Sequence, residues 1–280
     1  MDTLVSFEKL IYMDKFPIKL SEITDVEFYA DRLAFLPTFR PHTLDQVVLL
    51  CKEYCNNGEF KKELLDRASI SCPVIVYRLF ILGIFSFFDI ERYLSNKSCL
   101  LLGYYLKKYI DDFDKITKGK FFLLEFDEMY LENENEYEIL YKYGFFPGSL
   151  EYILKYDDIN ALQNTFNEDT HKPEQMKWSP FEWSRRPDYL DILSFSAFFG
   201  SLNCFKYLLL CGFGITDAVR ESSVSCGLLD IFHQCHGVDS DLKDVIMKAS
   251  EYCHLSLIHY LIEHGVDVNH NNMHANHNVF

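Results

Sequence analysis

The sequence predicts an all-α protein in which a helical N-terminal region, residues 1–144, precedes a solenoid of short helix–turn–helix repeats, residues 145–280. Three observations support this prediction. Apolar residues recur at the spacing of one helical face between residues 44 and 113. A Gly-Phe-Phe-Pro-Gly turn at 144–148 then marks a change in the character of the chain. Beyond this turn, similar segments return every 26 or 27 residues, as in repeat architectures.

The first helices of the N-terminal region follow from the spacing of their apolar residues. One set recurs at i, i+3, i+4, i+7 and i+11: Leu44, Val47, Val48, Cys51 and Cys55. The segment Phe60–Ala68 repeats this pattern one helix later. Between the two lies Asn57-Gly58, which joins helical patterns rather than alternating ones, so it predicts a helix–helix turn instead of a β-hairpin.

An apolar run, Val74–Phe88, follows Pro73 and predicts a buried helix. Arg78 interrupts the run, which is shorter than the roughly 18 residues that a transmembrane helix needs, so we expect no membrane span. Segments 90–94 and 100–113 predict two further helices.

Two stretches of the N-terminal region are less defined. Residues 18–29 fit either a strand or a short helix, and Pro37 and Pro41 are expected to close this part of the chain. Residues 125–138 contain seven carboxylates and no basic residue, which is typical of a solvated helix face or a connector.

The composition favours a cytoplasmic protein that binds neither nucleic acid nor membranes. Of the 280 residues, 49% are hydrophobic and 16% aromatic, which is enough for a buried core. A formal charge of −15 repels phosphate backbones and anionic lipid surfaces. The nine cysteines are odd in number and form no CxxC pair, as expected of reduced core thiols in the cytosol. We expect no signal peptide, because the first residues lack a basic segment and charged residues interrupt any apolar core.

The repeats are clearest in three segments, 196–208, 223–232 and 249–261. Each has a pair of small or β-branched residues, then an anchor, then a helix with two apolar residues four and five positions on; the anchors are Gly200, Gly227 and Cys253. We expect the glycine anchors to end the first helix of a pair in a left-handed cap. The apolar residues then fill the seam between neighbouring pairs: Cys204 and Phe205, Ile231 and Phe232, Leu257 and Ile258.

Segments 200–212 and 253–269 resemble the second helix and exit turn of ankyrin repeats. Residues 148–164 resemble an earlier, weaker unit whose two helices separate near Asp157-Asp158. The resemblance implies about four degenerate repeats, the last of them incomplete. Residues 178–183 and 193–210 resemble, more narrowly, the large ankyrin families of parasitic protists, in which a helical region precedes the repeats. The Thr-Pro-Leu-His motif is missing, and the period is shorter than the ankyrin period of about 33 residues.

Signatures of enzymes and of cofactor sites do not stand out in the sequence. GxGxxG, GxxxxGK[ST], GxSxG and HExxH motifs are missing, so we expect no enzyme and no cofactor. A metal site at His270 and His274 is not favoured, because they lie in a polar tail without accompanying carboxylates or thiols. Four cysteines fall at repeat positions that suit small buried residues, which explains them without catalysis: Cys204, Cys211, Cys226 and Cys253.

A connector between repeats contains both tryptophans of the chain and two arginines. We consider five of its residues as candidates for contact with a partner protein: Trp178, Phe181, Trp183, Arg185 and Arg186. Aromatic and arginine side chains are enriched in interface hot spots. The alternative is that both indoles fix a long insertion onto the stack of repeats, since a connector of this length needs anchoring.

These observations favour a monomeric, non-catalytic scaffold or adaptor that binds a protein partner through its repeats. A second hypothesis is that the N-terminal half, residues 35–113, is an effector or ligase-recruiting module and the repeats are its substrate receptor. A third is that the chain belongs to an expanded family and retains little function.

Overall fold

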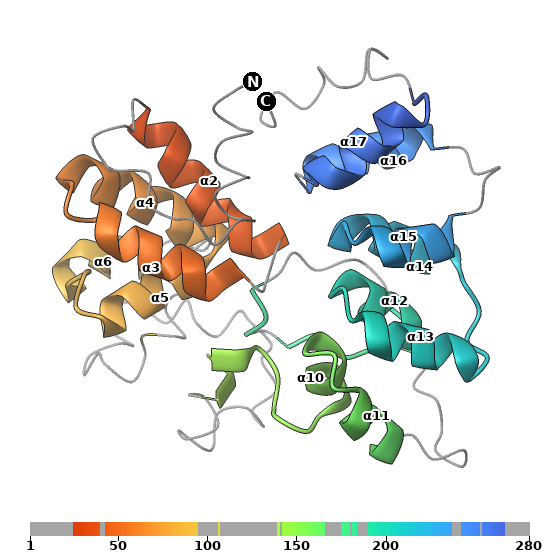
Figure 1. Ribbon diagram of the computed structural model, residues 1–280. Coiled ribbons are helices and arrows are strands. Elements are labelled where there is room, and N and C mark those ends of the chain that lie inside the picture. Colours follow the sequence, from red (N-terminus) through yellow and green to blue (C-terminus); the bar gives the residue numbers. More distant parts are fainter. Residues whose placement is uncertain are drawn as a thin grey trace. The chain divides into compact units, whose positions relative to one another are not determined.

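The computed structural model describes residues 25–39, 43–94, 106, 139–140, 142–165, 175–179, 181–183, 190–236, 242–252 and 254–266, and the elements in these ranges are helices (Figure 1). The described part of the chain is therefore all-α, as predicted. It divides into two compact units. Residues 25–145 and 179–183 belong to the N-terminal unit, and residues 146–178 and 190–266 belong to the C-terminal unit. The acidic stretch at 125–138 and most of the helix expected at 100–113 lie outside the described residues.

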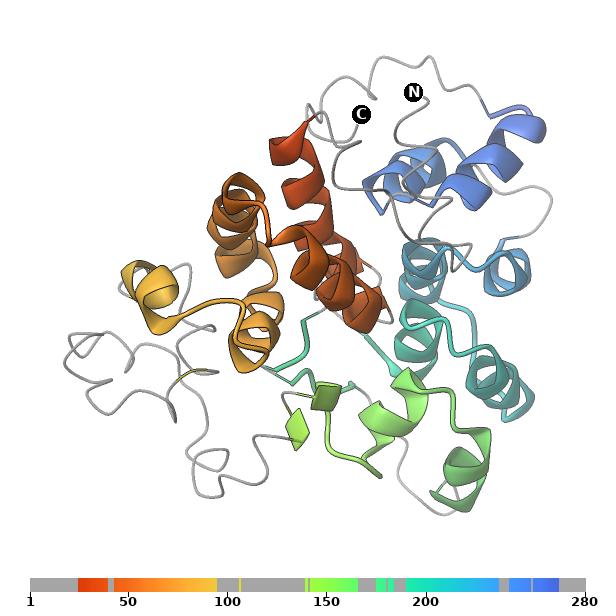
Figure 2. The same ribbon diagram turned by 60° about the vertical axis from the view of Figure 1, so that its left-hand side comes forward.

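Five helices build the N-terminal unit: α2 (Val26–Phe39), α3 (Leu44–Tyr54), α4 (Gly58–Ser71), α5 (Pro73–Ile81) and α6 (Phe87–Leu94). Helix α2 packs along α4, while α3 packs against α2 and α5 (Figures 1 and 2). Arg67 on α4 pairs with Asp31 on α2 at 3.3 Å and also with Glu27. The apolar faces that the sequence spacing predicts are the buried faces of α3 and α4.

Residues 26–29, for which the sequence allows either a strand or a short helix, belong to helix α2. The expected role of Pro37 as the end of this part of the chain is wrong. The helix continues through Pro37 to Phe39 instead of ending before the proline. A proline in the last turn removes only one N–H donor from the ladder. The Thr38 hydroxyl donates to the carbonyl of Phe35 at 2.6 Å, so this carbonyl near the helix end has a partner.

The Asn57-Gly58 turn and the helix at 90–94 are confirmed, but the helix in the run Val74–Phe88 ends earlier than expected, at Ile81. The side chain of Asn57 caps α4 by accepting hydrogen bonds from the amides of Glu59 and Phe60 at 2.9 and 3.1 Å. Helix α5 stops at Ile81 because Gly83 adopts a left-handed φ of 72°. The amide of Ile84 then donates to the carbonyl of Leu79, which closes the helix end.

The C-terminal unit contains four successive helix pairs: α10 (Leu150–Lys155) with α11 (Ile159–Thr165), α12 (Ile192–Phe198) with α13 (Leu202–Leu210), α14 (Asp217–Cys226) with α15 (Leu229–Cys235), and α16 (Lys243–Glu251) with α17 (Leu255–Glu263). First helices lie beside first helices, in the order α10, α12, α14, α16. Second helices follow the same order, α11 beside α13 and α13 beside α15. Figures 1 and 2 show the pairs from green to blue.

The turns inside the first three pairs share one backbone conformation. Gly200 and Gly227 have φ of 72° and 68°, so the predicted left-handed caps are confirmed. In the first pair, Asp157 takes the same place with φ of 56°, where the sequence predicts the separation of the two helices. Aspartate is one of the few residues that adopt this conformation at low cost. Glycines also end two second helices, Gly212 with φ of 87° and Gly265 with φ of 82°.

Candidate functional site

Side chains at the start of the second helices tie neighbouring pairs together. The Ser201 hydroxyl donates to the carbonyl of Leu154, near the end of α10. His254 occupies the same place in the last pair, two repeat periods later, and its Nε2 lies 2.6 Å from the carbonyl oxygen of Ser225, near the end of α14. A carbonyl only accepts, so Nε2 carries the hydrogen. Each bond joins one pair to the pair before it.

The turn of the first pair makes a further connection of the same kind. The carboxylate of Asp157 accepts from the amides of Asn203 and Cys204, at 3.2 and 2.8 Å, and from the Asn203 side chain at 2.8 Å. These amides belong to the first turn of α13, where helix N–H groups need partners and where a negative charge is favourable. Successive pairs are thus held by specific polar bonds as well as by apolar contact.

Apolar side chains fill the seam between the third and fourth pairs. Eight buried residues form one cluster there: Val224, Phe232, Val245, Ile246, Ala249, Leu257, Ile258 and Leu261. All six seam residues that the sequence predicts are buried, including Cys204 and Phe205 of the second pair. The pairs therefore form a fixed framework on which exposed side chains are held.

The connector residue Trp178 packs onto α12 and the residue that follows it. Its ring centroid lies 5.9, 5.8 and 5.9 Å from those of Phe195, Phe198 and Phe199. The adjoining segment is held by a hydrogen bond from the amide of Met176 to the carbonyl of Leu190, at 2.9 Å. These contacts agree with the alternative interpretation, in which the indole fixes the connector.

Phe181 and Trp183 are buried and belong to the N-terminal unit, whereas Trp178 belongs to the C-terminal unit. The hydroxyl of Ser179 accepts from the amide of Phe181 at 3.1 Å and shapes this turn. A partner cannot reach two buried rings, so the structure does not offer Phe181 and Trp183 as the contact surface that their composition suggests. Arg185 and Arg186 lie outside the described residues.

Comparison with protein-family models, with curated proteins and with solved structures finds no match for this chain. Function has to be inferred from the chain's own surface. Every residue of α12 is buried and the residues of α10 are buried or half-buried, so the exposed residues of the first helices lie on α14 and α16.

We call this exposed surface the α14–α16 face and define it by five residues: Asp217, Arg220, Glu221, Met247 and Lys248. Arg220 pairs with Asp217 at 2.7 Å, and Lys248 pairs with Glu221 across the two helices at 3.0 Å. Met247, with 40% of its surface exposed, adds a flexible apolar group among the charges. Such a mixed surface suits contact with a polar protein surface. Local sequence patterns do not reveal this face, because only the packing of α14 against α16 brings residues 217–221 next to residues 247–248.

The structure suggests neither metal binding nor a membrane span within the residues that it describes. In those residues no group of three or more histidine, cysteine or acidic side chains is arranged to hold a metal ion. No described helix is both long enough and apolar enough to cross a bilayer. The tail histidines at 270, 274 and 277 lie outside the described residues.

The thiols differ in exposure, and one prediction about them is wrong. Cys204 is buried as expected, Cys226 is half-buried, and Cys253 lies outside the described residues. Cys211 is exposed at the end of α13, because a residue just past the last turn of a helix leaves the apolar face. Burial raises the pKa of Cys204, and the nearby charge of Asp157 raises it further. Burial also raises the pKa of Cys226 to about 12 and that of Cys235 to about 11.

Among the four described thiols of the C-terminal unit, we expect iodoacetamide to modify Cys211 first in the folded protein at pH 8, with Cys204, Cys226 and Cys235 reacting at least about tenfold more slowly. The thiolate is the reactive species, and a raised pKa keeps the thiol protonated. Peptide mass spectrometry over a time course measures the four rates, and labelling in urea serves as the control in which they should converge. Equal rates in the folded protein would show that these thiols are not protected.

Proposed function

We propose that this chain is a non-catalytic protein-interaction module, a scaffold or adaptor, whose C-terminal helix pairs form a degenerate ankyrin-like repeat stack. The packing order of the helices supports this proposal most strongly, because each first helix adjoins the next first helix along the chain. Stacked repeats build a continuous surface from residues that are distant in sequence, and such surfaces commonly bind proteins.

Equivalent positions in successive pairs are consistent with repetition. Left-handed residues end the first helices of the first three pairs. The N-caps of α12 and α14, Asp191 and Thr216, accept from the amides of Ser194 and Val219 at 2.7 and 3.3 Å. The hydrogen bonds from the side chains of Ser201 and His254 to a carbonyl of the preceding pair occur two repeat periods apart. Leu228 stands at the intermediate position without a polar side chain, which fits a degenerate array.

The α14–α16 face is the surface that we assign to the partner. It carries both signs of charge, so a partner with complementary charged and polar side chains fits it better than a uniformly charged polymer does. Met247 lies among these charges and supplies apolar contact area. Buried residues of α14 and α16 pack together in the cluster between the third and fourth pairs, which holds the two helices side by side and lowers the entropic cost of binding.

Affinity capture of the intact protein tests this function. We expect Met247→Asp to weaken binding of a stoichiometric partner by about tenfold or more, the effect of losing roughly 1.4 kcal/mol of binding free energy. Leu49→Asp is the matched control, because Leu49 is a 64% exposed apolar residue on α3 of the other unit. Both variants must keep the circular dichroism of the parent. Loss of the partner with Leu49→Asp alone would assign binding to the N-terminal unit instead.

A further inference from the structure

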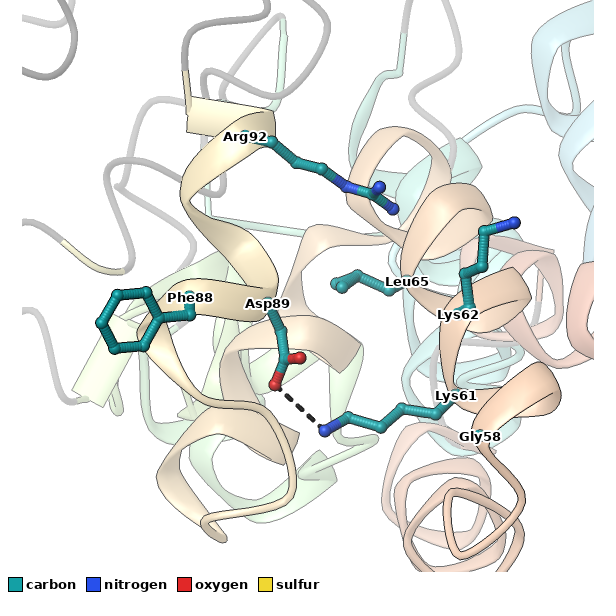
Figure 3. Close-up of a pocket in the computed structure, with 7 residues that line it drawn as sticks. All are labelled: Gly58, Lys61, Lys62, Leu65, Phe88, Asp89 and Arg92. Carbon is teal, nitrogen blue, oxygen red and sulfur yellow. Dashed lines mark hydrogen bonds and ion pairs between the residues drawn. The ribbon is translucent and has the colours of Figure 1, made fainter.

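A pocket of about 280 Å³ opens between α4 and α6 in the N-terminal unit (Figure 3). Helix α4 contributes Lys61, Lys62 and Leu65, and α6 contributes Phe88, Asp89 and Arg92. Figure 3 shows Arg92 extending from α6 toward α4, Leu65 between the two helices, and Lys61 reaching Asp89. Its volume is just below the range of about 300–1,000 Å³ for small-molecule sites, so it suits one side chain better than a cofactor.

Two of the cationic side chains are already ordered. Lys61 Nζ lies 3.0 Å from Asp89 Oδ2, and Arg92 Nη2 lies 2.9 Å from Asp66 Oδ1. The Arg92 guanidinium also lies 4.6 Å from the ring centroid of Tyr93. Side chains fixed in advance lose less conformational entropy when a ligand binds.

Asp89 is a fixed anion of the pocket wall. It accepts from the amide and the hydroxyl of Ser86 at 2.7 and 2.9 Å, in addition to its pairing with Lys61. Partial burial acts to raise the pKa of Asp89, but the hydrogen bonds from Ser86 and the charge of Lys61 outweigh it, and the pKa is lowered overall. Asp89 therefore stays ionised at neutral pH and holds Lys61 in position.

The pocket lining has a net positive charge, whereas the whole chain has a net negative charge. Three lining residues are basic and one is acidic, whereas the chain has a formal charge of −15. Lys62 is exposed, and within the described residues it forms no ion pair. Its ammonium group can therefore bind an anion without first giving up an ion pair.

We propose that this pocket binds an acidic side chain, aspartate or glutamate, of a partner polypeptide. The ammonium of Lys62 and the guanidinium of Arg92 contact the carboxylate, and Phe88 at the rim, 87% exposed, offers contact area to a neighbouring apolar residue. A carboxylate fits better than a phosphate, because sites for phosphate dianions usually collect several arginines and this pocket has one. The pocket is a different site from the α14–α16 face, so an experiment can refute one of the two proposals without refuting the other.

Fluorescence anisotropy with the full-length protein and three labelled peptides tests the pocket. The peptides share a sequence with a leucine between two acidic positions; these positions hold glutamate, glutamine or phosphoserine. We expect the glutamate peptide to bind, with an affinity that falls as salt increases, and the glutamine peptide to bind at least about tenfold more weakly. Tighter binding of the phosphoserine peptide than of the glutamate peptide would overturn the assignment to a carboxylate.

Lys62→Glu is the decisive variant, and Lys52→Glu is its matched control. Both lysines are exposed on helices of the same unit, and both changes alter the net charge equally, but Lys52 on α3 does not line the pocket. We expect Lys62→Glu to weaken binding of the glutamate peptide by about tenfold or more and Lys52→Glu to change it less than about twofold. Equal weakening by both variants, or no binding of the glutamate peptide to the parent protein, would refute the proposal.

Discussion

Gly227→Ala is expected to destabilise the C-terminal unit by roughly 3 kcal/mol. A Cβ atom at Gly227 would lie 2.2 Å from Nδ1 of His254 and 2.3 Å from its Cγ, so the buried imidazole would have to move. The left-handed φ of 68° adds the cost of placing an L side chain in this conformation, about 1–2 kcal/mol, to an overpacking cost of about 1–3 kcal/mol. Moving the ring also breaks the hydrogen bond from His254 to Ser225.

Gly212→Ala is the matched control for this prediction. Gly212 has a left-handed φ of 87°, but no atom lies within 4 Å of its added Cβ, so only the conformational cost of about 1 kcal/mol is expected. Adding His254→Ala to Gly227→Ala should recover part of the loss, because it removes the steric conflict.

The two tryptophans allow this measurement to be made on one unit. Trp178 belongs to the C-terminal unit and Trp183 to the N-terminal unit. In a Trp183→Phe background, fluorescence in urea therefore follows the C-terminal unit, which avoids treating a chain with two units as a single two-state system. Equal destabilisation by Gly227→Ala and Gly212→Ala would contradict the contact between Gly227 and His254.

Phe232→Ala is expected to cost about 3–5 kcal/mol in the same assay, the usual range for truncating a buried phenylalanine. Its ring centroid lies 4.3 Å from that of His236 and 6.0 Å from that of Tyr260 on α17. Phe232 also belongs to the buried cluster that joins the third and fourth helix pairs. Its loss therefore weakens the seam between two pairs as well as the packing within one.

Hydrogen exchange distinguishes a weakened seam from a local effect. We expect Phe232→Ala to accelerate amide exchange in α17 as well as in α15, since the two helices share the cluster. Leu210→Ala on α13 is the control, because Leu210 is 87% exposed and its truncation should change stability by less than about 0.5 kcal/mol. Unchanged exchange in α17 would mean that the pairs do not stabilise one another.

Local sequence features predict the helix pairs because their determinants lie close together in the chain. The glycines at 200 and 227 adopt the left-handed caps expected of them, and the first pair divides at Asp157-Asp158. Apolar residues four and five positions after the anchors are buried, since the 26–27-residue period places them at the same seam in each pair.

The sequence predictions are wrong where tertiary contacts or a single turn determine the local structure. Pro37 was expected to end α2, yet it lies inside the last turn. The run Val74–Phe88 is apolar at most positions, and the turn at Gly83 still ends α5 within it. Trp183 is buried, and the composition of the connector does not predict whether its side chains are buried or exposed.

The pocket of the N-terminal unit could not be found from local patterns either. Lys61 and Lys62 on α4 meet Asp89 and Arg92 on α6 only after the chain has folded back through α5. In the sequence these residues look like ordinary solvated helix charges. The ion pair between Lys61 and Asp89 becomes evident only in the folded structure.

Hydrogen exchange of the full-length protein, free and bound to its captured partner, tests most directly whether the stack of helix pairs is the interaction module. We predict that the partner slows amide exchange in α14 and α16, where the exposed residues of the first helices lie, and leaves α3 unchanged. Slower exchange confined to α3–α6, with α14 and α16 unaffected, would contradict a partner site on the stack and assign binding to the N-terminal unit.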